Sequence, residues 1–297
     1  MIAFFGKHEI ISQWQEVLQG EKGFVFCENY QTLFNYSPKT TTVVYVRIPS
    51  QASLKIALKL KSRGYRVCKF WAGTDSRYFN DAKWWDKQLA KWIYRFCLVK
   101  NLSPASWLSE TLEKNGLKVN YWPSCSPIFL QKEQLNKADV LALQAQRNSA
   151  ILIYSNADRH WIYNTNMMLE LAEQLVDTPF IFVGDDSLNV EHLPNVTSLG
   201  RISTDKLFDL YRTSKCLVRI TSHDGYSRMI IEAMYFGLPV VTNWPVPHAY
   251  QCHTLDEIKQ ILQKDLPFNQ QGYDYVRAEF NLDKWKNILL TLAEEEI

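Results

Sequence analysis

Residues 222–243, SHDGYSRMIIEAMYFGLPVVTN, combine groups that could bind an anion and a sugar. Gly225 would let a ligand approach the backbone closely, and the Ser227 hydroxyl suits a helix N-cap. Free N–H groups at such a helix start favour phosphate. Glu232 lies five residues into this otherwise apolar helical segment, where a carboxylate needs donors such as a sugar's vicinal hydroxyls. The alternative is that Glu232 pairs with a lysine or caps another loop.

An arginine and an acid stand just before this helix. The apolar run CLVRIT (216–221) predicts a buried strand, yet it contains Arg219 and leads into Asp224. A buried guanidinium needs an anionic partner, which either the protein or a ligand can supply. The turn after this strand is therefore a candidate binding site.

Strand and helix patterns alternate along the whole chain, which predicts parallel sheets with helices on both faces. The pattern restarts at AILIYS (150–155), so we expect an α/β protein with two Rossmann-like domains. One of the expected strands is FCLVK (96–100). We place an N-terminal domain at 1–140 and a C-terminal, ligand-binding domain at 141–270. Helices in 271–297 are expected to pack back toward the N-terminal domain.

Composition excludes several classes of protein. The 33 basic and 31 acidic residues give a net charge of +2, so we expect no nucleic-acid partner. No apolar run approaches the roughly 18 residues of a membrane-spanning helix, and the N-terminus does not resemble a signal peptide. The six cysteines form no CxxC pair. Buried thiols in a cytoplasmic protein are the simplest interpretation; zinc ligands or disulfides are the alternatives.

The segment from Asp224 to Val241 resembles a known motif. An acid followed by seven residues, a glutamate and AMYFGLPVV is similar to the acid-x7-Glu signature of retaining, family-4-type glycosyltransferases with the GT-B fold. The preceding LGRISTDKLFDLYRTSKCLVRI also resembles that family. The resemblance covers roughly residues 150–243, and the N-terminal half matches in architecture alone. It implies two Rossmann-like domains facing each other across a cleft.

The resemblance also implies roles for individual residues. Glu232 would hold the ribose hydroxyls of a nucleotide-diphosphate sugar, and Asp224 would contact the hydroxyls of the donor sugar. Helix N-terminal amides would bind the diphosphate, which falls to the backbone of Gly225, Tyr226, Ser227 and Arg228. Gly184, in the turn of FIFVGDDS, would lie near the base, and Arg201 could stack on that base.

The chain departs from the family pattern at the phosphate site. The family's Arg-x4-Lys pair corresponds to Arg159 and Asn164, so the lysine is missing. Arg228 adds a positive charge where the family usually has none. We expect Arg228 or Arg219 to replace the lysine; the alternatives are weak diphosphate binding or none, and an exposed loop arginine at position 159.

The N-terminal half offers three candidate features. Gly6 follows the first expected strand and fits a glycine loop that approaches the donor. Asp75, in FWAGTDSRYF, is expected to face the reaction centre, unless it merely caps a helix. DAKWWDKQLAKWIYRF (81–96) predicts an amphipathic helix rich in Lys and Trp. Its apolar stripe is either core or a surface for acceptor or membrane contact.

The resemblance implies retaining, metal-independent transfer of a sugar to an acceptor hydroxyl of a carbohydrate, glycan or lipid-linked molecule. It implies no cofactor beyond the nucleotide-sugar co-substrate, with Asp224, Arg159 and Asp75 at the reaction centre. Two alternatives stay open: a nucleotide-sugar epimerase and a non-catalytic scaffold. A dehydrogenase is disfavoured because no GxGxxG follows the first strand of either half. We expect a cytoplasmic protein, with association to a membrane surface through 81–96 as a further possibility.

Overall fold

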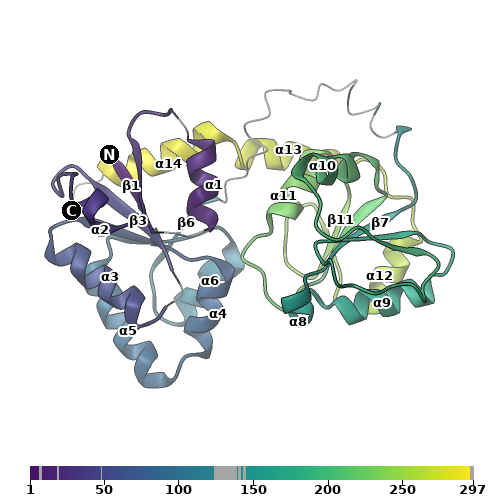
Figure 1. The fold of residues 1–297 in the computed structure, drawn as a ribbon, viewed down its shortest axis with the longest axis horizontal. Coiled ribbons are helices and arrows are strands. Elements are labelled where there is room, and N and C mark those ends of the chain that lie inside the picture. Colours follow the sequence, from purple (N-terminus) through teal and green to yellow (C-terminus); the bar gives the residue numbers. More distant parts are fainter. Residues whose placement is uncertain are drawn as a thin grey trace. The chain divides into compact units, whose positions relative to one another are not determined.

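The chain forms two compact units, each built around its own sheet (Figure 1). The computed structural model describes residues 1–6, 9–18, 20–47, 49–123, 139, 142 and 145–294. The first unit comprises residues 1–131 and 280–297, and the second comprises residues 132–279. The chain therefore changes unit near residues 131 and 279, where the sequence suggested boundaries at 140 and 270.

Both sheets have six strands, and all strand pairs are parallel, which confirms the predicted doubled Rossmann-like architecture. The strand order in the first unit is β2-β1-β3-β4-β5-β6. Its strands are β1 (Ile2–Phe5), β2 (Phe24–Cys27), β3 (Thr42–Val46), β4 (Arg66–Phe70), β5 (Lys100–Ser103) and β6 (Val119–Tyr121). Its helices are α1 (Glu9–Val17), α2 (Tyr30–Leu33), α3 (Gln51–Ser62), α4 (Gly73–Asp81), α5 (Trp84–Cys97), α6 (Ser106–Lys114) and α14 (Leu282–Glu294).

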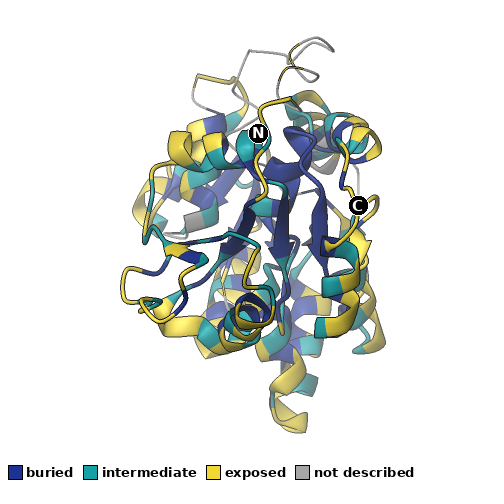
Figure 2. Ribbon diagram, turned by 90° about the vertical axis from the view of Figure 1, so that its right-hand side faces the viewer, coloured by how far each residue is buried: buried dark blue, intermediate teal, exposed yellow. Residues whose placement is uncertain are grey.

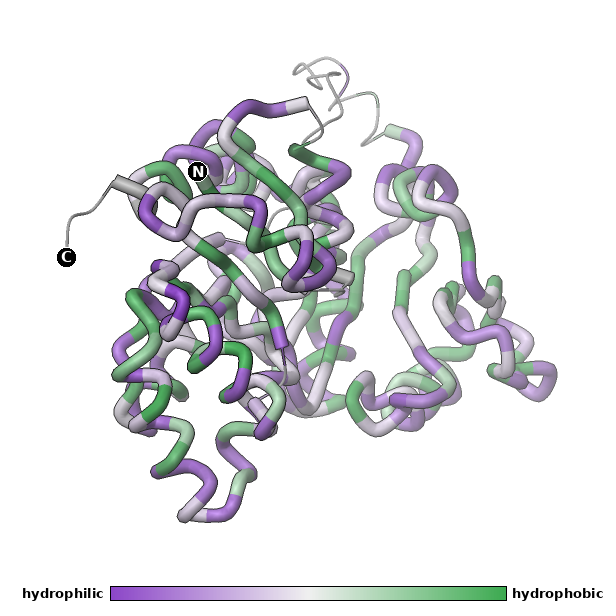
Figure 3. Tube along the Cα trace, turned by 60° about the vertical axis from the view of Figure 1, so that its left-hand side comes forward, coloured by the Kyte–Doolittle hydropathy of each residue, from purple (hydrophilic) through white to green (hydrophobic). Residues whose placement is uncertain are grey.

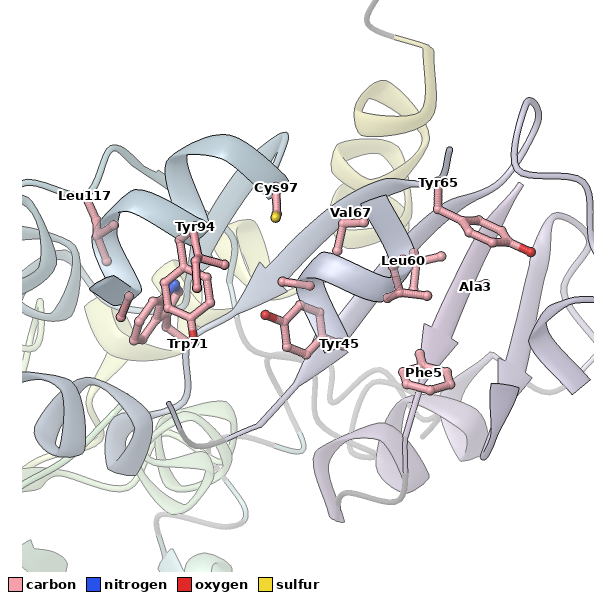
Figure 4. Packing of buried hydrophobic residues seen from close by; sticks show 14 of the residues in the cluster. Ala3, Phe5, Tyr45, Leu60, Tyr65, Val67, Trp71, Tyr94, Cys97 and Leu117 are labelled. Atoms are coloured by element: carbon pink, nitrogen blue, oxygen red, sulfur yellow. The ribbon is translucent and has the colours of Figure 1, made fainter. Parts of the chain in front are cut away.

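Alternate strand residues in this unit feed two different cores. Ala3 and Phe5 of β1 pack in one cluster, whereas Ile2 and Phe4 pack in another. This alternation is the two-residue period of a strand buried on both faces. Figure 4 shows the first cluster, in which Tyr45, Trp71 and Tyr94 come together from β3, the end of β4 and α5.

The predicted strand at 96–100 is wrong. Helix α5 continues through Cys97, and strand β5 begins at Lys100. Cys97 is buried on the same helical face as Ala90, Ile93 and Tyr94, at positions spaced three or four residues apart. The helix therefore includes the first two residues of the apolar run FCLV, which had suggested a strand.

The second sheet has the order β12-β11-β10-β7-β8-β9. Its strands are β7 (Ile151–Tyr154), β8 (Phe180–Val183), β9 (Val196–Ser198), β10 (Cys216–Arg219), β11 (Val240–Thr242) and β12 (Tyr250–Gln251). Its helical segments are η2 (Ala157–Arg159), α8 (His160–Tyr163), α9 (Thr165–Gln174), α10 (Thr204–Thr213), α11 (Arg228–Tyr235), α12 (Leu255–Leu262) and α13 (Gln270–Glu279). The central strands β7, β10 and β11 are almost entirely buried, and in Figure 2 the central strands are dark blue.

The strand orders predict where each unit binds a ligand. Counted within its own unit, the second sheet has the 3-2-1-4-5-6 order of dinucleotide-binding domains, and its order reverses between β7 and β10. In the first sheet the reversal lies between β1 and β3. Ligands of open α/β sheets bind outside the carboxyl ends of the strands at such switch points.

None of the helices in the described part of the chain is long and apolar enough to cross a membrane.

Candidate functional site

The second unit has a pocket at the switch point that its strand order predicts. The pocket has a volume of about 530 Å³ and opens at the carboxyl ends of β7, β8 and β10. Thirteen residues line it, from the strand ends, the loops that follow them and the helices α8, α10 and α11: Tyr154, Asn156, Tyr163, Val183, Gly184, Arg201, Ile202, Leu207, Arg219, Ser227, Arg228, Met229 and Glu232. Six of these were predicted from the sequence: Gly184, Arg201, Arg219, Ser227, Arg228 and Glu232.

The N-terminus of α11 presents backbone donors to this pocket. Ser227 is the N-cap residue, but its side chain makes no capping hydrogen bond. The Ser227 carbonyl accepts the first backbone hydrogen bonds of the helix, from the amides of Ile230 and Ile231. Within the described residues, the backbone N–H groups of Arg228 and Met229 have no acceptor. Such N–H groups, together with the helix dipole, favour an anion.

The turn before α11 is strained at an unexpected residue. Tyr226 has a φ of 80°, a backbone conformation that a non-glycine residue rarely adopts. Gly225, which the sequence singled out for backbone freedom, has no such positive φ. The Tyr226 ring is buried, and its hydroxyl lies 3.5 Å from that of Tyr275 in α13. Packing against α13 therefore holds Tyr226 in place and fixes the direction in which α11 begins.

Glu232 is a buried carboxylate on the pocket wall, with 6% of its surface exposed. The Tyr211 hydroxyl in α10 donates a hydrogen bond to Glu232 Oε2 at 3.3 Å. Burial, and then the nearby Glu232 charge, raise the pKa of Tyr211 well above its usual value, so the hydroxyl keeps its proton and remains a donor. Tyr211 thus orients Glu232, and sequence analysis missed this contact because the two residues lie on different helices.

Arg219 and Asp224 form an ion pair beside the pocket. Arg219 Nε lies 3.0 Å from Asp224 Oδ2, and the two side chains are only 10% and 7% exposed. Burial lowers the pKa of Arg219, but the charge and hydrogen bond of Asp224, together with Tyr163 and Tyr154, outweigh burial and raise it. Asp224 is thus the protein partner that the buried guanidinium required. Arg219 lines the pocket, whereas Asp224 does not.

The pocket is positively charged. Arg201, Arg219 and Arg228 line it together with a single carboxylate, that of Glu232. Arg201 is paired with Asp186, with 3.4 Å between Nε and Oδ2, and is 77% exposed. Arg228 forms no ion pair within the described part of the chain. Of the three arginines, Arg228 therefore has the greatest capacity to bind a ligand anion.

The turn after β8 is shaped by a glycine that cannot be replaced without strain. Gly184 has a φ of 98°, and a Cβ there would lie 2.5 Å from the Tyr154 ring and 2.6 Å from the Ser155 carbonyl oxygen. Its amide donates to the Gly200 carbonyl at 2.6 Å. The chain therefore passes close to β7 at this point, and Gly184 forms part of the pocket wall.

A histidine and an aspartate that we had not predicted as site residues connect the loops after β7 and β8. His160 Nε2 lies 2.5 Å from Asp185 Oδ2, and the Asp185 side chain is 1% exposed. Asp185 also accepts from the Ser187 backbone amide and hydroxyl, at 2.9 and 2.7 Å. Burial would raise the pKa of Asp185, but the hydrogen bonds from His160 and Ser187 lower it to about 2. The run GDDS had suggested only a solvated turn, since spacing alone does not reveal His160 as its partner.

Arg159 and Asn164 lie on the short helical loop after β7. Arg159 is exposed and does not line the pocket. Its charge still acts on the pocket residue Tyr163, whose pKa burial raises while Arg219 and Arg159 oppose the rise. Asn164, at the position of the missing lysine, has the left-handed φ of 47° and donates to the Ile220 carbonyl at 3.4 Å. Its side chain thus ties the loop after β7 to the residues that follow β10.

The first unit has a second pocket, of about 840 Å³, at its own switch point between β1 and β3. Gly6 lines this pocket and has a φ of 111°, which makes a glycine favourable there. The polar side chains in the wall include Glu28, Asn29, Arg47 and Lys55. Gly6 therefore lines a pocket of the first unit, whereas six predicted residues line the pocket of the second unit.

Asp75 is not in either pocket. It lies in the first turn of α4, and its Oδ2 is 3.0 Å from Lys69 Nζ, with both side chains fully or almost fully buried. Lys69 also donates to the Arg47 carbonyl at 2.6 Å and lies over the Trp71 ring at 4.3 Å. Burial lowers the pKa of Lys69, against the opposing effect of Asp75. This geometry makes Asp75 the counterion of a buried lysine.

Sequence comparison identifies the second unit. Residues 149–257 match the family described as glycosyl transferases group 1. This range runs from the residues before β7 to α12 and contains every residue that lines the 530 Å³ pocket. No curated protein matches the chain in sequence.

Solved structures with the same fold include several glycosyltransferases. HepE of Anabaena, solved with UDP, matches with a TM-score of 0.70 and 13% identity over 99% of this chain and 100% of its own. The pneumococcal O-GlcNAc transferase GtfA, solved with UDP and GlcNAc, matches with a TM-score of 0.61 and 14% identity over 90% of this chain and 59% of its own. Sucrose-phosphate synthase from Thermosynechococcus elongatus matches with a TM-score of 0.59 and 15% identity over 89% and 74% of the two chains.

The two sheets, the family match over the second unit and the likeness in fold over nearly the whole chain agree with one another. Residues 149–257 of the chain match the group 1 glycosyltransferase family, and the chain as a whole has the GT-B fold of two Rossmann-like domains.

Proposed function

We propose that this chain transfers a sugar, with retention, from a nucleotide-diphosphate sugar to an acceptor hydroxyl. The observation that carries the proposal is the 530 Å³ pocket at the β7/β10 switch point, where three arginines and a helix N-terminus meet a single buried carboxylate. Cations and amides suit a diphosphate, and the carboxylate suits a ribose diol. HepE and GtfA, which share the fold, were each solved with UDP.

The diphosphate would be held by Arg228 and by the free amides of Arg228 and Met229. The arginine and the amides are in position before the nucleotide sugar binds. They can therefore stabilise the negative charge that develops as the nucleotide diphosphate leaves. Arg219 would add a second cation, which Asp224 holds in position at 3.0 Å. Arg159 would be a third cation, contributed by the loop after β7.

Glu232 would accept hydrogen bonds from the ribose hydroxyls, with Tyr211 fixing its orientation. The base would lie near Gly184 and Arg201, which line the pocket beside the end of β8. In this arrangement the protein's own cations balance the charge of the diphosphate. We therefore propose that transfer needs no metal, and that a chelator such as EDTA leaves the rate unchanged.

The acceptor would bind in the first unit, in the 840 Å³ pocket at the β1/β3 switch point. Arg47, Lys55, Asn29 and Glu28 provide donors and acceptors of the kind that bind sugar hydroxyls. We propose a carbohydrate, a glycan or a lipid-linked sugar as the acceptor. Asp75 has no part in this proposal, because it is buried against Lys69.

The test is binding of nucleotides, followed by turnover. The full chain is screened by thermal shift against UDP, GDP, ADP and TDP and their sugars, and the best donor is then assayed for hydrolysis or transfer. We expect one nucleotide series to raise the melting temperature. Glu232→Ala should abolish turnover while retaining fold.

Two outcomes would contradict the proposal. If no nucleotide diphosphate or nucleotide sugar binds, the chain is a non-catalytic scaffold. This outcome is worth testing because Asn164 stands where the family has a phosphate-binding lysine. If the donor sugar is isomerised rather than transferred or hydrolysed, as mass spectrometry and chromatography of the product would reveal, the chain is an epimerase.

A further inference from the structure

Helix α5 exposes an unusual amount of apolar surface. Four of its side chains, Trp85, Leu89, Trp92 and Phe96, are between 51% and 76% exposed and follow one another at spacings of three or four residues. We call these four residues the α5 stripe. Trp84, which is 60% exposed, lies next to it. In Figure 3 the turn between α4 and α5 lies at the bottom of the view, where hydrophobic positions alternate with hydrophilic ones along the helix.

The α5 stripe is not core, which corrects one of the two interpretations of the sequence pattern. The helix already buries a different face, that of Ala90, Ile93, Tyr94 and Cys97, in the first unit's sheet cluster. The Tyr94 hydroxyl also lies 3.0 Å from the Ser53 hydroxyl of α3. The α5 stripe is therefore additional apolar surface that folding of the described chain leaves in water.

The exposed rings are ordered against one another. Trp84 and Trp85 pack edge to face with their centroids 4.3 Å apart, and Trp92 stacks on Phe96 at 5.9 Å with an angle of 5° between the planes. Large apolar side chains are stabilised by burial, so leaving several of them exposed on one helix is unfavourable unless another molecule covers them.

Basic side chains lie next to the α5 stripe. The helix and its N-cap residue contribute four of them: Lys83, Lys87, Lys91 and Arg95. The acidic residue of the helix is Asp86. Lys87 donates to the Asn80 carbonyl at 2.8 Å and Arg95 to the Gly116 carbonyl at 2.6 Å. None of the four forms an ion pair within the described residues, so their charges are not neutralised by the protein there.

We propose that α5 is a docking surface for an anionic lipid bilayer, with the α5 stripe inserted at the level of the headgroups. Tryptophan is favoured at that depth, because its ring has both apolar and polar character. The neighbouring cations match anionic headgroups, and their long stems can extend toward them. A protein partner fits the surface less well, because the cores of protein interfaces are depleted of lysine.

Docking through this surface is peripheral. Helix α5 has 14 residues, too few to cross a bilayer of about 30 Å at 1.5 Å per residue. It packs beside α3, whose Ala52, Lys55 and Ile56 line the 840 Å³ pocket. If that pocket binds the acceptor, docking would favour an acceptor attached to lipid. This last consequence rests on the proposed function, whereas docking itself does not.

The test is co-sedimentation of the full chain with vesicles. We expect binding to vesicles of phosphatidylcholine and phosphatidylglycerol in equal parts, at least tenfold weaker binding to phosphatidylcholine alone, and loss of binding as salt rises. The double variant Trp85→Ser, Trp92→Ser should bind anionic vesicles at least tenfold more weakly. Lys87→Gln with Lys91→Gln should weaken binding and reduce its dependence on salt.

Trp161→Ser is the matched control, because Trp161 is 53% exposed but lies in the second unit, and it should bind vesicles like the unchanged chain. All variants should retain nucleotide binding, which shows that they fold and separates this test from that of the proposed function. Failure of the unchanged chain to bind anionic vesicles would overturn the proposal. Equal binding by the double variant would also overturn it, as would a dimer that dissociates when the α5 stripe is changed and that binds no vesicles.

Discussion

At the scale of single residues, Arg228 is the arginine of the 530 Å³ pocket that is best placed to bind an anion. Arg219 is committed to Asp224, and Arg201 is exposed and paired with Asp186, so Arg228 is the pocket cation without an ion pair among the described residues. It is the first residue of α11, where its own amide and that of Met229 have no acceptor within the described residues. In this position Arg228 can supply the positive charge that the family's lysine carries and that Asn164 does not.

Arg228→Gln should weaken the binding of a nucleoside diphosphate about 10- to 100-fold. The expected loss is that of one charge-assisted hydrogen bond to phosphate, about 1.5–3 kcal/mol. Isothermal titration calorimetry measures it directly. Lys206→Gln, the same change of charge at an exposed position of α10, serves as the control and should bind normally. An Arg228→Gln variant with unchanged affinity would show that another group carries the diphosphate.

The contact between His160 and Asp185 makes the stability of the folded chain depend on pH in the acid range. The pKa of Asp185 is lowered from 3.8 to about 2 in the folded chain. Around pH 3, therefore, the folded chain binds fewer protons at Asp185 than the unfolded chain does. Its stabilisation, roughly 2 kcal/mol for a shift of about two pKa units, is present above pH 4 and disappears as the pH falls toward 2.

Asp185→Asn should therefore lower the free energy of unfolding of the second unit by roughly 2 kcal/mol at pH 7. The gap between variant and unchanged chain should narrow as the pH falls below 4, because the unchanged chain loses the same charge. Urea titrations followed by circular dichroism at a series of pH values would measure it. A gap that stays constant down to low pH would mean that the carboxylate charge is not the source of the stabilisation.

At the scale of elements, the turns after the strands hold the site together. Gly184 lets the end of β8 approach β7 so closely that a side chain there would overlap Tyr154 and Ser155. The same turn carries Asp185, which contacts His160 in the loop after β7. The positions of both loops thus depend on one glycine.

Gly184→Ala should destabilise the second unit by more than 2 kcal/mol and weaken nucleotide binding, because it adds a steric clash to an unfavourable φ. Gly23→Ala is the matched control. Its φ of 91° is similar to the 98° of Gly184, but a Cβ there would meet nothing within 4 Å. Thermal unfolding of the two variants separates backbone strain from the clash, and equal losses would contradict the role given to Gly184.

Helices and strands could be predicted from the sequence more reliably than the contacts between side chains. The alternation of strands and helices was sufficient to predict both sheets, because buried parallel strands and amphipathic helices have distinct periods. It failed at 96–100, where an apolar run continued a helix. Partners such as Tyr211 for Glu232 and His160 for Asp185 could not be predicted, since they meet only after the chain has folded. Asp75 looked like a site residue because nothing in the sequence indicated that Lys69 would be buried beside it.

At the scale of the whole molecule, the chain leaves the first unit, builds the second and then returns. Helix α13 packs against α11 in the second unit, whereas α14 packs in the first. Trp285 of α14 is 1% exposed and stacks on Trp122 at 5.0 Å, next to Trp14 and Phe4. Residues from both ends of the sequence therefore complete a single core.

This topology predicts that the two units can be destabilised separately. Trp285→Ala removes a large ring from the first unit's core and should cost about 3–5 kcal/mol there. The 530 Å³ pocket, where we propose that the nucleotide binds, lies entirely in the second unit, so affinity for a nucleoside diphosphate should stay within twofold of the unchanged chain. Scanning calorimetry should show one transition moved to lower temperature by the substitution and another raised by nucleotide. Trp161→Ala, an exposed tryptophan of the second unit, should leave the first of these transitions in place. If Trp285→Ala instead lowered nucleotide affinity severalfold, the donor site would depend on the first unit's core.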